Sequence, residues 1–127
     1  IGAPNGHACR ARPLRLAFSN VCLFRTIAQR TLDSAGIPWE MAVEGDGQTA
    51  IEATVSADLA VHAGLEGTAP ADLTEIPDSA GLPKLGEMQI NLYCGNPGAG
   101  PAMDDLVDLI AQAYGRGQPA LRQVVSA

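Results

Sequence analysis

The first half of the chain alternates between two hydrophobic periodicities. Residues 14–18 form a short apolar run typical of a strand, and residues 39–43 form a second one. Between them, Gly36 and Pro38 predict the end of a helix. The apolar positions that recur at helical spacing and form its buried stripe are Phe24, Ile27, Ala28, Thr31, Leu32 and Ala35. A strand–helix–strand unit of this size predicts a parallel sheet covered by helices.

The same pattern then repeats with a shorter helix. Residues 44–49 form a polar turn, residues 50–55 have an apolar inner face, and residues 59–63 form an uninterrupted apolar strand. This half of the chain is therefore predicted to be β-α-β-α-β.

Both strand-to-helix turns carry residues that are typical of helix caps. Ser19 or Asn20 is predicted to cap the first helix. Thr49, followed three residues later by Glu52, predicts a capping box on the second helix. The two glycines of the second turn permit backbone angles that other residues avoid.

The second half is less regular. Prolines and glycines interrupt residues 64–86, which predicts loops with one short strand near residues 73–76. Residues 88–94 alternate enough to predict a strand with one exposed face. Pro101 is predicted to open a final helix with an acidic first turn, and Gly115 to end it.

Composition narrows the classes of protein. A net charge of −6 argues against a nucleic-acid or anionic-membrane surface on this piece, and no apolar run approaches the roughly 18 residues of a membrane span. The cysteines Cys9, Cys22 and Cys94 are odd in number and widely spaced, which suits buried thiols in a reducing cytoplasm.

Catalytic chemistry has few candidates. His62 lies within an apolar strand, where a histidine is usually a hydrogen-bonded core residue. Neither a Gly-x-Ser-x-Gly elbow nor a full dinucleotide-binding turn occurs, because Ala50 stands where the third glycine would be. His7 and Cys9 lack the second pair that a zinc site needs. We therefore expect no enzyme activity, no metal and no cofactor.

The remaining candidate site follows from geometry. In an open parallel sheet, ligands gather outside the carboxyl ends of the strands, where helices begin. Free backbone N–H groups at these helix starts suit a small anion such as a carboxylate. The candidate binding residues are Ser19, Asn20, Gly45, Asp46, Gly47, Gln48 and Thr49. Helix capping alone explains the same residue types equally well, and the nearby Arg25 is expected to be solvated.

Several short sequence pieces occur in a characteristic order from Ile1 to about Tyr114. They are Ile1-Gly2-Ala3, Arg12-Pro13-Leu14-Arg15-Leu16, Cys22-Leu23-Phe24-Arg25, Leu32-Asp33-Ser34-Ala35-Gly36-Ile37-Pro38-Trp39 and Pro101-Ala102. In this order and spacing they resemble the effector-binding domain of a LysR-type transcriptional regulator. The family usually has Ala-Gly-Leu-Gly-Val where Ala57-Asp58-Leu59-Ala60-Val61 stand here, so Asp58 is expected to act as a polar stop.

The resemblance implies an α/β, type II periplasmic-binding-protein-like fold, in which two lobes enclose a small-molecule cleft. Residues 1–114 match the second lobe, a mainly parallel sheet flanked by helices, with a helix that returns toward the first lobe, and residues 115–127 are a tail. The implied partners are a small, anionic effector and further copies in a homo-oligomer. DNA would be contacted only through an absent N-terminal helix-turn-helix, no membrane is involved, and the location is cytoplasmic. A lone lobe is expected to bind effector weakly or not at all.

Two other classes stay open. One is a fragment of an exported solute-binding transport protein, and the other is a small doubly wound enzyme, because one fold hosts many functions. The coding sequence upstream of Ile1 distinguishes them, since a helix-turn-helix indicates the regulator and a signal peptide indicates the transport protein.

Overall fold

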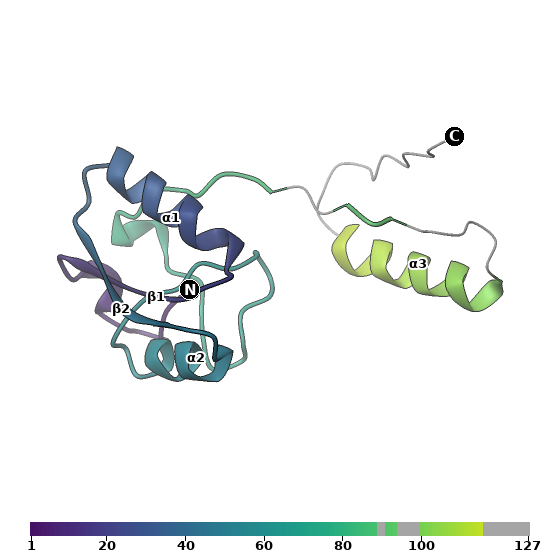
Figure 1. Cartoon of the computed structure of the whole chain (residues 1–127), viewed down its shortest axis with the longest axis horizontal. Coiled ribbons are helices and arrows are strands. Elements are labelled where there is room, and N and C mark those ends of the chain that lie inside the picture. Colours follow the sequence, from purple (N-terminus) through teal and green to yellow (C-terminus); the bar gives the residue numbers. More distant parts are fainter. Residues whose placement is uncertain (89–90, 94–99, 116–127) are drawn as a thin grey trace. The chain divides into compact units, whose positions relative to one another are not determined.

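The computed structural model describes residues 1–88, 91–93 and 100–115 (Figure 1). The chain divides into two units, Ile1–Gly86 and Glu87–Ala127, which are described separately. The first unit is a small α/β domain built on a two-stranded parallel sheet.

The predicted strand–helix–strand unit is confirmed. It consists of strand β1 (Leu14–Ser19), helix α1 (Leu23–Ser34) and strand β2 (Trp39–Gly45). The strands pair in parallel with one register shift, between Leu16 and Ala17, and Ser19 at the end of β1 lies opposite Gly45 at the end of β2. The turns that follow β1 and β2 therefore leave the sheet at the same edge.

Helix α1 ends where the sequence predicts. Gly36 has a φ of +66°, and the amide of Ile37 donates to the carbonyl of Leu32 at 3.0 Å. A left-handed glycine with this backbone hydrogen bond is a common way to end a helix. Pro38 then leads directly into β2.

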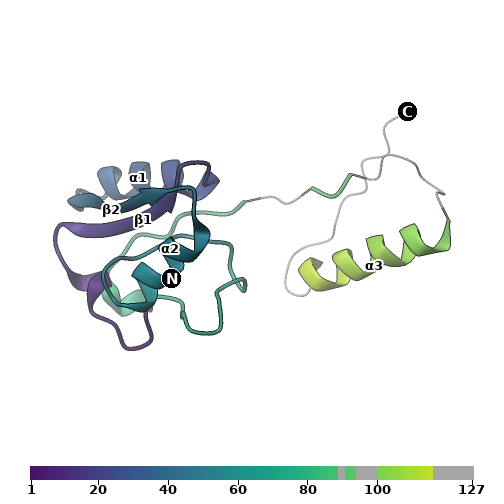
Figure 2. The same ribbon diagram turned by 60° about the horizontal axis from the view of Figure 1, so that its bottom comes forward.

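Alternate residues of β1 pack on opposite sides of the sheet, as the pleat of a strand requires. Leu14, Leu16 and Phe18 are at most 2% exposed and pack in a core layer with residues of α1. Ala17 faces the other way and packs with helix α2 (Gln48–Ser56). The two helices lie on opposite sides of the strands in both ribbon views (Figures 1 and 2).

The predicted third strand over residues 59–63 is wrong in extent. Only Val61 forms a parallel bridge, to Leu16, through hydrogen bonds of 2.8 Å and 3.0 Å to β1. The next amide, that of His62, donates instead to the carbonyl of Ile1 at 3.1 Å. The chain therefore leaves β1 after one residue, and a regular strand does not form.

The loops predicted over residues 64–86 are present, with one short 3-10 helix, η2 (Asp78–Ala80). The short strand expected near residues 73–76 is a single antiparallel bridge between Thr74 and Gly2. A second 3-10 helix, η1 (Ala8–Arg10), precedes β1.

In the second unit, helix α3 (Pro101–Gly115) begins at the predicted proline. The strand predicted over residues 88–94 lies partly outside the described residues, and residues 88 and 91–93 are not in a strand. The predicted tail beyond residue 115 lies outside the described residues.

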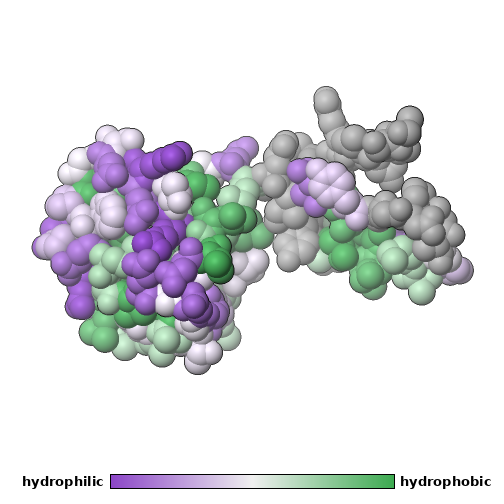
Figure 3. All heavy atoms as spheres, viewed as in Figure 1, coloured by the Kyte–Doolittle hydropathy of each residue, from purple (hydrophilic) through white to green (hydrophobic). Residues whose placement is uncertain are grey.

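Helix α3 carries exposed apolar side chains. Met103, Leu106 and Leu109 are 42%, 50% and 62% exposed, and Figure 3 shows apolar surface along this helix. Among the described residues, no helix combines the length and the apolar character needed to cross a membrane.

Candidate functional site

The turns that follow β1 and β2 are joined by hydrogen bonds at the carboxyl edge of the sheet. The backbone amide of Asn20 donates to the carbonyl of Gly45 at 3.2 Å, and its side-chain Nδ2 donates to Asp46 Oδ1 at 2.9 Å. Ser19 ends β1 opposite Gly45. The residues that follow and begin α2 are Gly47, Gln48 and Thr49. All seven predicted residues are thus brought to one edge.

The predicted cap of α1 is wrong. The helix begins at Leu23 with Cys22 at its N-cap, and no side chain makes the cap hydrogen bond. Ser19 lies too far upstream, and its buried hydroxyl instead accepts the backbone N–H of Val21 at 3.2 Å. The amide of Cys22 donates to the carbonyl of Ser19 at 3.2 Å, so these residues form a turn before the helix starts.

The predicted capping box of α2 is also wrong. Gly47 is the N-cap and lacks a side chain to make the bond, and Thr49 already lies inside the helix. The Glu52 carboxylate accepts instead from Gln48 Nε2 at 3.0 Å, one turn along the helix. The first N–H groups of α2 therefore have no side-chain cap among the described residues.

The glycines of the second turn do not use the backbone freedom expected of them. Gly47 has a φ of −91°, and Gly45 is not among the described residues with positive φ. A Cβ added at Gly45 would meet no atom within 4 Å, and one added at Gly47 would meet only the Ala50 side chain at 3.9 Å. Other residues would therefore fit at both positions.

The carboxyl edge is acidic. Glu44 and Asp46 are two residues apart there, and Glu52 lies at the middle of α2. Arg25 is ion-paired to Glu44 at 2.7 Å, with only 24% of its side chain exposed. Arg25 is therefore partly solvated, and it also forms a surface ion pair with Glu44 that was not expected.

His62 is hydrogen-bonded, as predicted, but it is only partly buried. Its Nδ1 lies 2.8 Å from the Ala17 carbonyl, and its ring packs at 4.9 Å from the ring of Phe18. Burial lowers the pKa of His62 below its ordinary value of 6.5, because the charged imidazolium is poorly solvated there. Within the described residues, no group of three His, Cys, Asp or Glu side chains could hold a metal ion.

Asp58 is the residue whose role the sequence revealed only in part. It follows the C-cap of α2 with a φ of +56°, so it stops the helix as predicted. Its carboxylate also accepts the backbone N–H groups of His7 at 2.7 Å and Ala8 at 3.0 Å. These bonds lower the pKa of Asp58 because they stabilise its charged form. No local sequence signal indicates a contact across about 50 residues.

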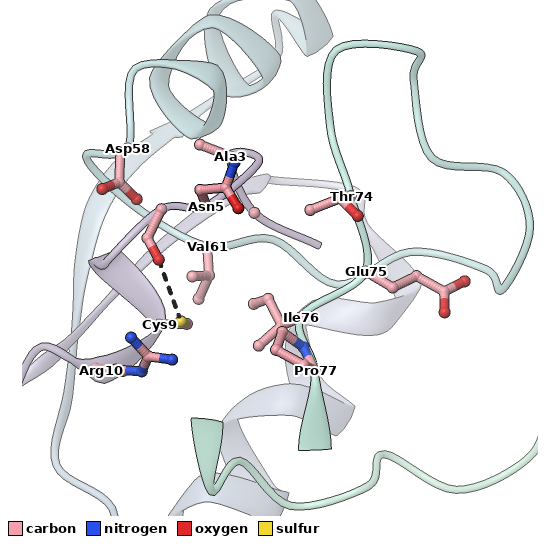
Figure 4. Close-up of a pocket in the computed structure, with 12 residues that line it drawn as sticks. Ala3, Asn5, Cys9, Arg10, Asp58, Val61, Thr74, Glu75, Ile76 and Pro77 are labelled. Carbon is pink, nitrogen blue, oxygen red and sulfur yellow. Dashed lines mark hydrogen bonds between the residues drawn. The ribbon is translucent and has the colours of Figure 1, made fainter. Parts of the chain in front are cut away.

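Sequence reasoning also missed a hollow of about 420 Å³ at the other end of the strands (Figure 4). It is lined by residues that precede β1 and residues that follow α2, together with residues 74–77. The chain matches no protein-family model, no curated protein and no solved structure.

Proposed function

We propose that the chain is the second lobe of the effector-binding domain of a LysR-type transcriptional regulator, with a type II periplasmic-binding-protein-like fold. The ordered sequence pieces described above support this proposal, and the parallel β1–α1–β2 unit is compatible with it. Effector binding between two lobes would favour one arrangement of the lobes. That change in the arrangement of the lobes would alter how an N-terminal helix-turn-helix binds DNA.

The proposal rests on the contact between the turn that follows β1 and the turn that follows β2. The Asn20–Asp46 hydrogen bond joins them at the carboxyl edge, which is where open α/β sheets bind ligands. Both turns lead into helices whose first N–H groups have no side-chain cap among the described residues. These N–H groups are donors that an acidic ligand group can use.

The charges at the edge refine the class of effector. Asp46 is exposed, and its carboxylate opposes a ligand with several negative charges. A ligand with one carboxylate and one ammonium or other donor group fits better. The backbone N–H groups at the start of α2 would receive the carboxylate, and Asp46 would accept the donor. We therefore propose a small amino-acid-like or monocarboxylate effector.

Exposed apolar side chains beside the site support a partner surface. Val21 and Leu23 are 83% and 76% exposed; Val21 lies in the first turn, and Leu23 is the first residue of α1. Large apolar side chains of this kind often mark an interface when they are grouped. We assign them to contact with the first lobe or with a further copy in a homo-oligomer.

Calorimetry tests the proposal. The 127-residue chain is titrated with small monocarboxylates and amino acids, alongside a longer chain that includes the preceding lobe. The lone chain is expected to bind weakly or not at all, because it supplies half of the cleft, and the longer chain is expected to bind one compound with micromolar affinity. Asp46→Ala should abolish that binding, whereas the control Glu66→Ala, far along the chain in a loop, should not. Micromolar binding by the lone chain, or no effect of Asp46→Ala, contradicts the proposal.

A further inference from the structure

The hollow at the amino end of the strands has walls from three separate segments, residues 2–10, 58–61 and 74–77 (Figure 4). Its volume of about 420 Å³ lies within the roughly 300–1,000 Å³ of typical small-molecule pockets. Residues from each wall are Asn5, Arg10, Val61 and Ile76. The hollow shares no residue with the turns at the carboxyl edge.

The walls are fixed by hydrogen bonds that need no ligand. Gly6 donates its amide to Ala3 at 3.0 Å across a turn in which Asn5 has a φ of +59°. Proline followed by a left-handed residue is typical of a tight type II turn. The Asp58 carboxylate holds the start of η1, as described above.

Residues 74–77 are tied to the first segment of the wall by a short antiparallel bridge. Gly2 and Thr74 exchange two backbone hydrogen bonds, each of 2.9 Å. A pocket whose walls are already ordered loses little conformational entropy when a ligand binds. The hollow is therefore pre-formed.

The lining of the hollow combines buried apolar side chains with one positively charged side chain, that of Arg10. Cys9 and Val61 are 7% and 5% exposed, and with Ile76 they form the apolar part of the hollow (Figure 4). Arg10 is exposed at its rim and forms no ion pair or side-chain hydrogen bond with any described residue.

Neither acid of the lining forms an ion pair with Arg10 in the part of the chain that the structure describes. Both Asp58 oxygens already accept backbone N–H groups. The Glu75 side chain extends away from the centre of the hollow in Figure 4. Arg10 is thus the charged group best placed to meet a ligand, and a guanidinium binds a carboxylate through paired N–H donors.

We propose that this hollow is a second ligand site, which binds a small monocarboxylate with a short apolar chain. The Arg10 guanidinium holds the carboxylate, and Cys9, Val61 and Ile76 cover the apolar chain. This site does not depend on the function proposed for the carboxyl edge.

An NMR titration of the isotope-labelled 127-residue chain tests the proposal with hexanoate as the probe. Hexanamide is the matched neutral probe, since it keeps the apolar chain and removes the charge. Hexanoate is expected to give saturable shifts of the backbone amides of Arg10, Val61 and Ile76. Hexanamide is expected to bind at least about 10-fold more weakly, the loss typical of one charge-assisted hydrogen bond.

Variants locate the charge that binds. Arg10→Gln should weaken hexanoate binding to the level of hexanamide. Arg10→Lys should bind with an intermediate affinity, because it keeps the charge and loses the paired N–H donors. Arg30→Gln, at an exposed arginine of α1, should have no effect. The spectra themselves report whether each variant is folded. The proposal is overturned if hexanoate gives no saturable shifts at these residues, if both probes bind equally, or if Arg10→Gln binds as the native chain does. Shifts confined to residues 19–20 and 45–49 also overturn it, and they would support the carboxyl-edge site instead.

Discussion

The two ends of the parallel strands are built differently. At the amino end, a carboxylate, a tight turn and a two-residue bridge hold three segments together, and Asn5 and Asp58 both adopt positive φ. At the carboxyl end, the glycines have ordinary backbone angles and both helices start without side-chain caps. The amino end therefore carries more of the stability, and the carboxyl end leaves more backbone donors available to a ligand.

The largest predicted effect contrasts glycines at the two ends. A Cβ on Gly6 would collide with the Asp58 carboxylate and lie 3.0 Å from the Ala3 carbonyl, so Gly6→Ala must displace the Asp58 contact. We expect it to destabilise the chain by about 2–3 kcal/mol. Gly45→Ala meets no atom within 4 Å and should change stability by about 0.5 kcal/mol or less. Urea unfolding measures both, and equal losses would contradict the difference between the ends.

The next effect separates the two roles of Asp58. Asp58→Ala loses both the carboxylate and a residue type that tolerates positive φ, and we expect a loss of about 2 kcal/mol. Asp58→Gly keeps the backbone conformation and should lose about 1 kcal/mol, the usual value of a helix cap. If both variants unfold at the same urea concentration as the native chain, the hydrogen bonds of the Asp58 carboxylate do not stabilise the amino end.

The same carboxylate predicts a pH dependence. The pKa of Asp58 is lowered in the folded chain, so the unfolded chain takes up a proton first as the pH falls. The stabilisation is therefore complete above the ordinary pKa of 3.8 and is lost as the pH falls through the lower, folded pKa. The difference in unfolding free energy between the native chain and Asp58→Asn should shrink over that range. A difference that stays constant with pH would assign the effect to something other than the charge.

The smallest effect concerns the link between the two turns at the carboxyl end. Asn20 and Asp46 are exposed, so a double-mutant cycle with Asn20→Ala and Asp46→Ala should give a coupling of about 0.5 kcal/mol. The single variants should unfold close to the native chain. A coupling as large as the loss in Gly6→Ala would mean that both ends are equally important for stability.

The sequence predicts the parts of this fold that depend on local patterns. The apolar periodicities and Gly36 located β1, α1 and β2, because period and turn chemistry act within a few residues. The helix caps were predicted wrongly because Ser19 and Thr49 have the right side chains at the wrong positions relative to the first helical residue. A one- or two-residue difference in a helix start is beyond pattern reasoning.

Contacts between distant segments could not be predicted. The single bridge at Val61, the Arg25–Glu44 ion pair and the contacts of Asp58 with residues 7 and 8 all join segments that sequence patterns treat separately. The juxtaposition of the seven candidate residues was predictable, since it follows from the parallel order of two strands. Whether those residues bind a ligand does not follow from that order, because capping residues and ligand-binding residues are of the same types.

Sequencing the reading frame upstream of Ile1 tests the proposed regulator. We predict a basic, winged helix-turn-helix followed by a first α/β lobe that would complete the cleft at the carboxyl edge. A signal peptide in place of the helix-turn-helix would contradict a regulator and indicate an exported solute-binding protein.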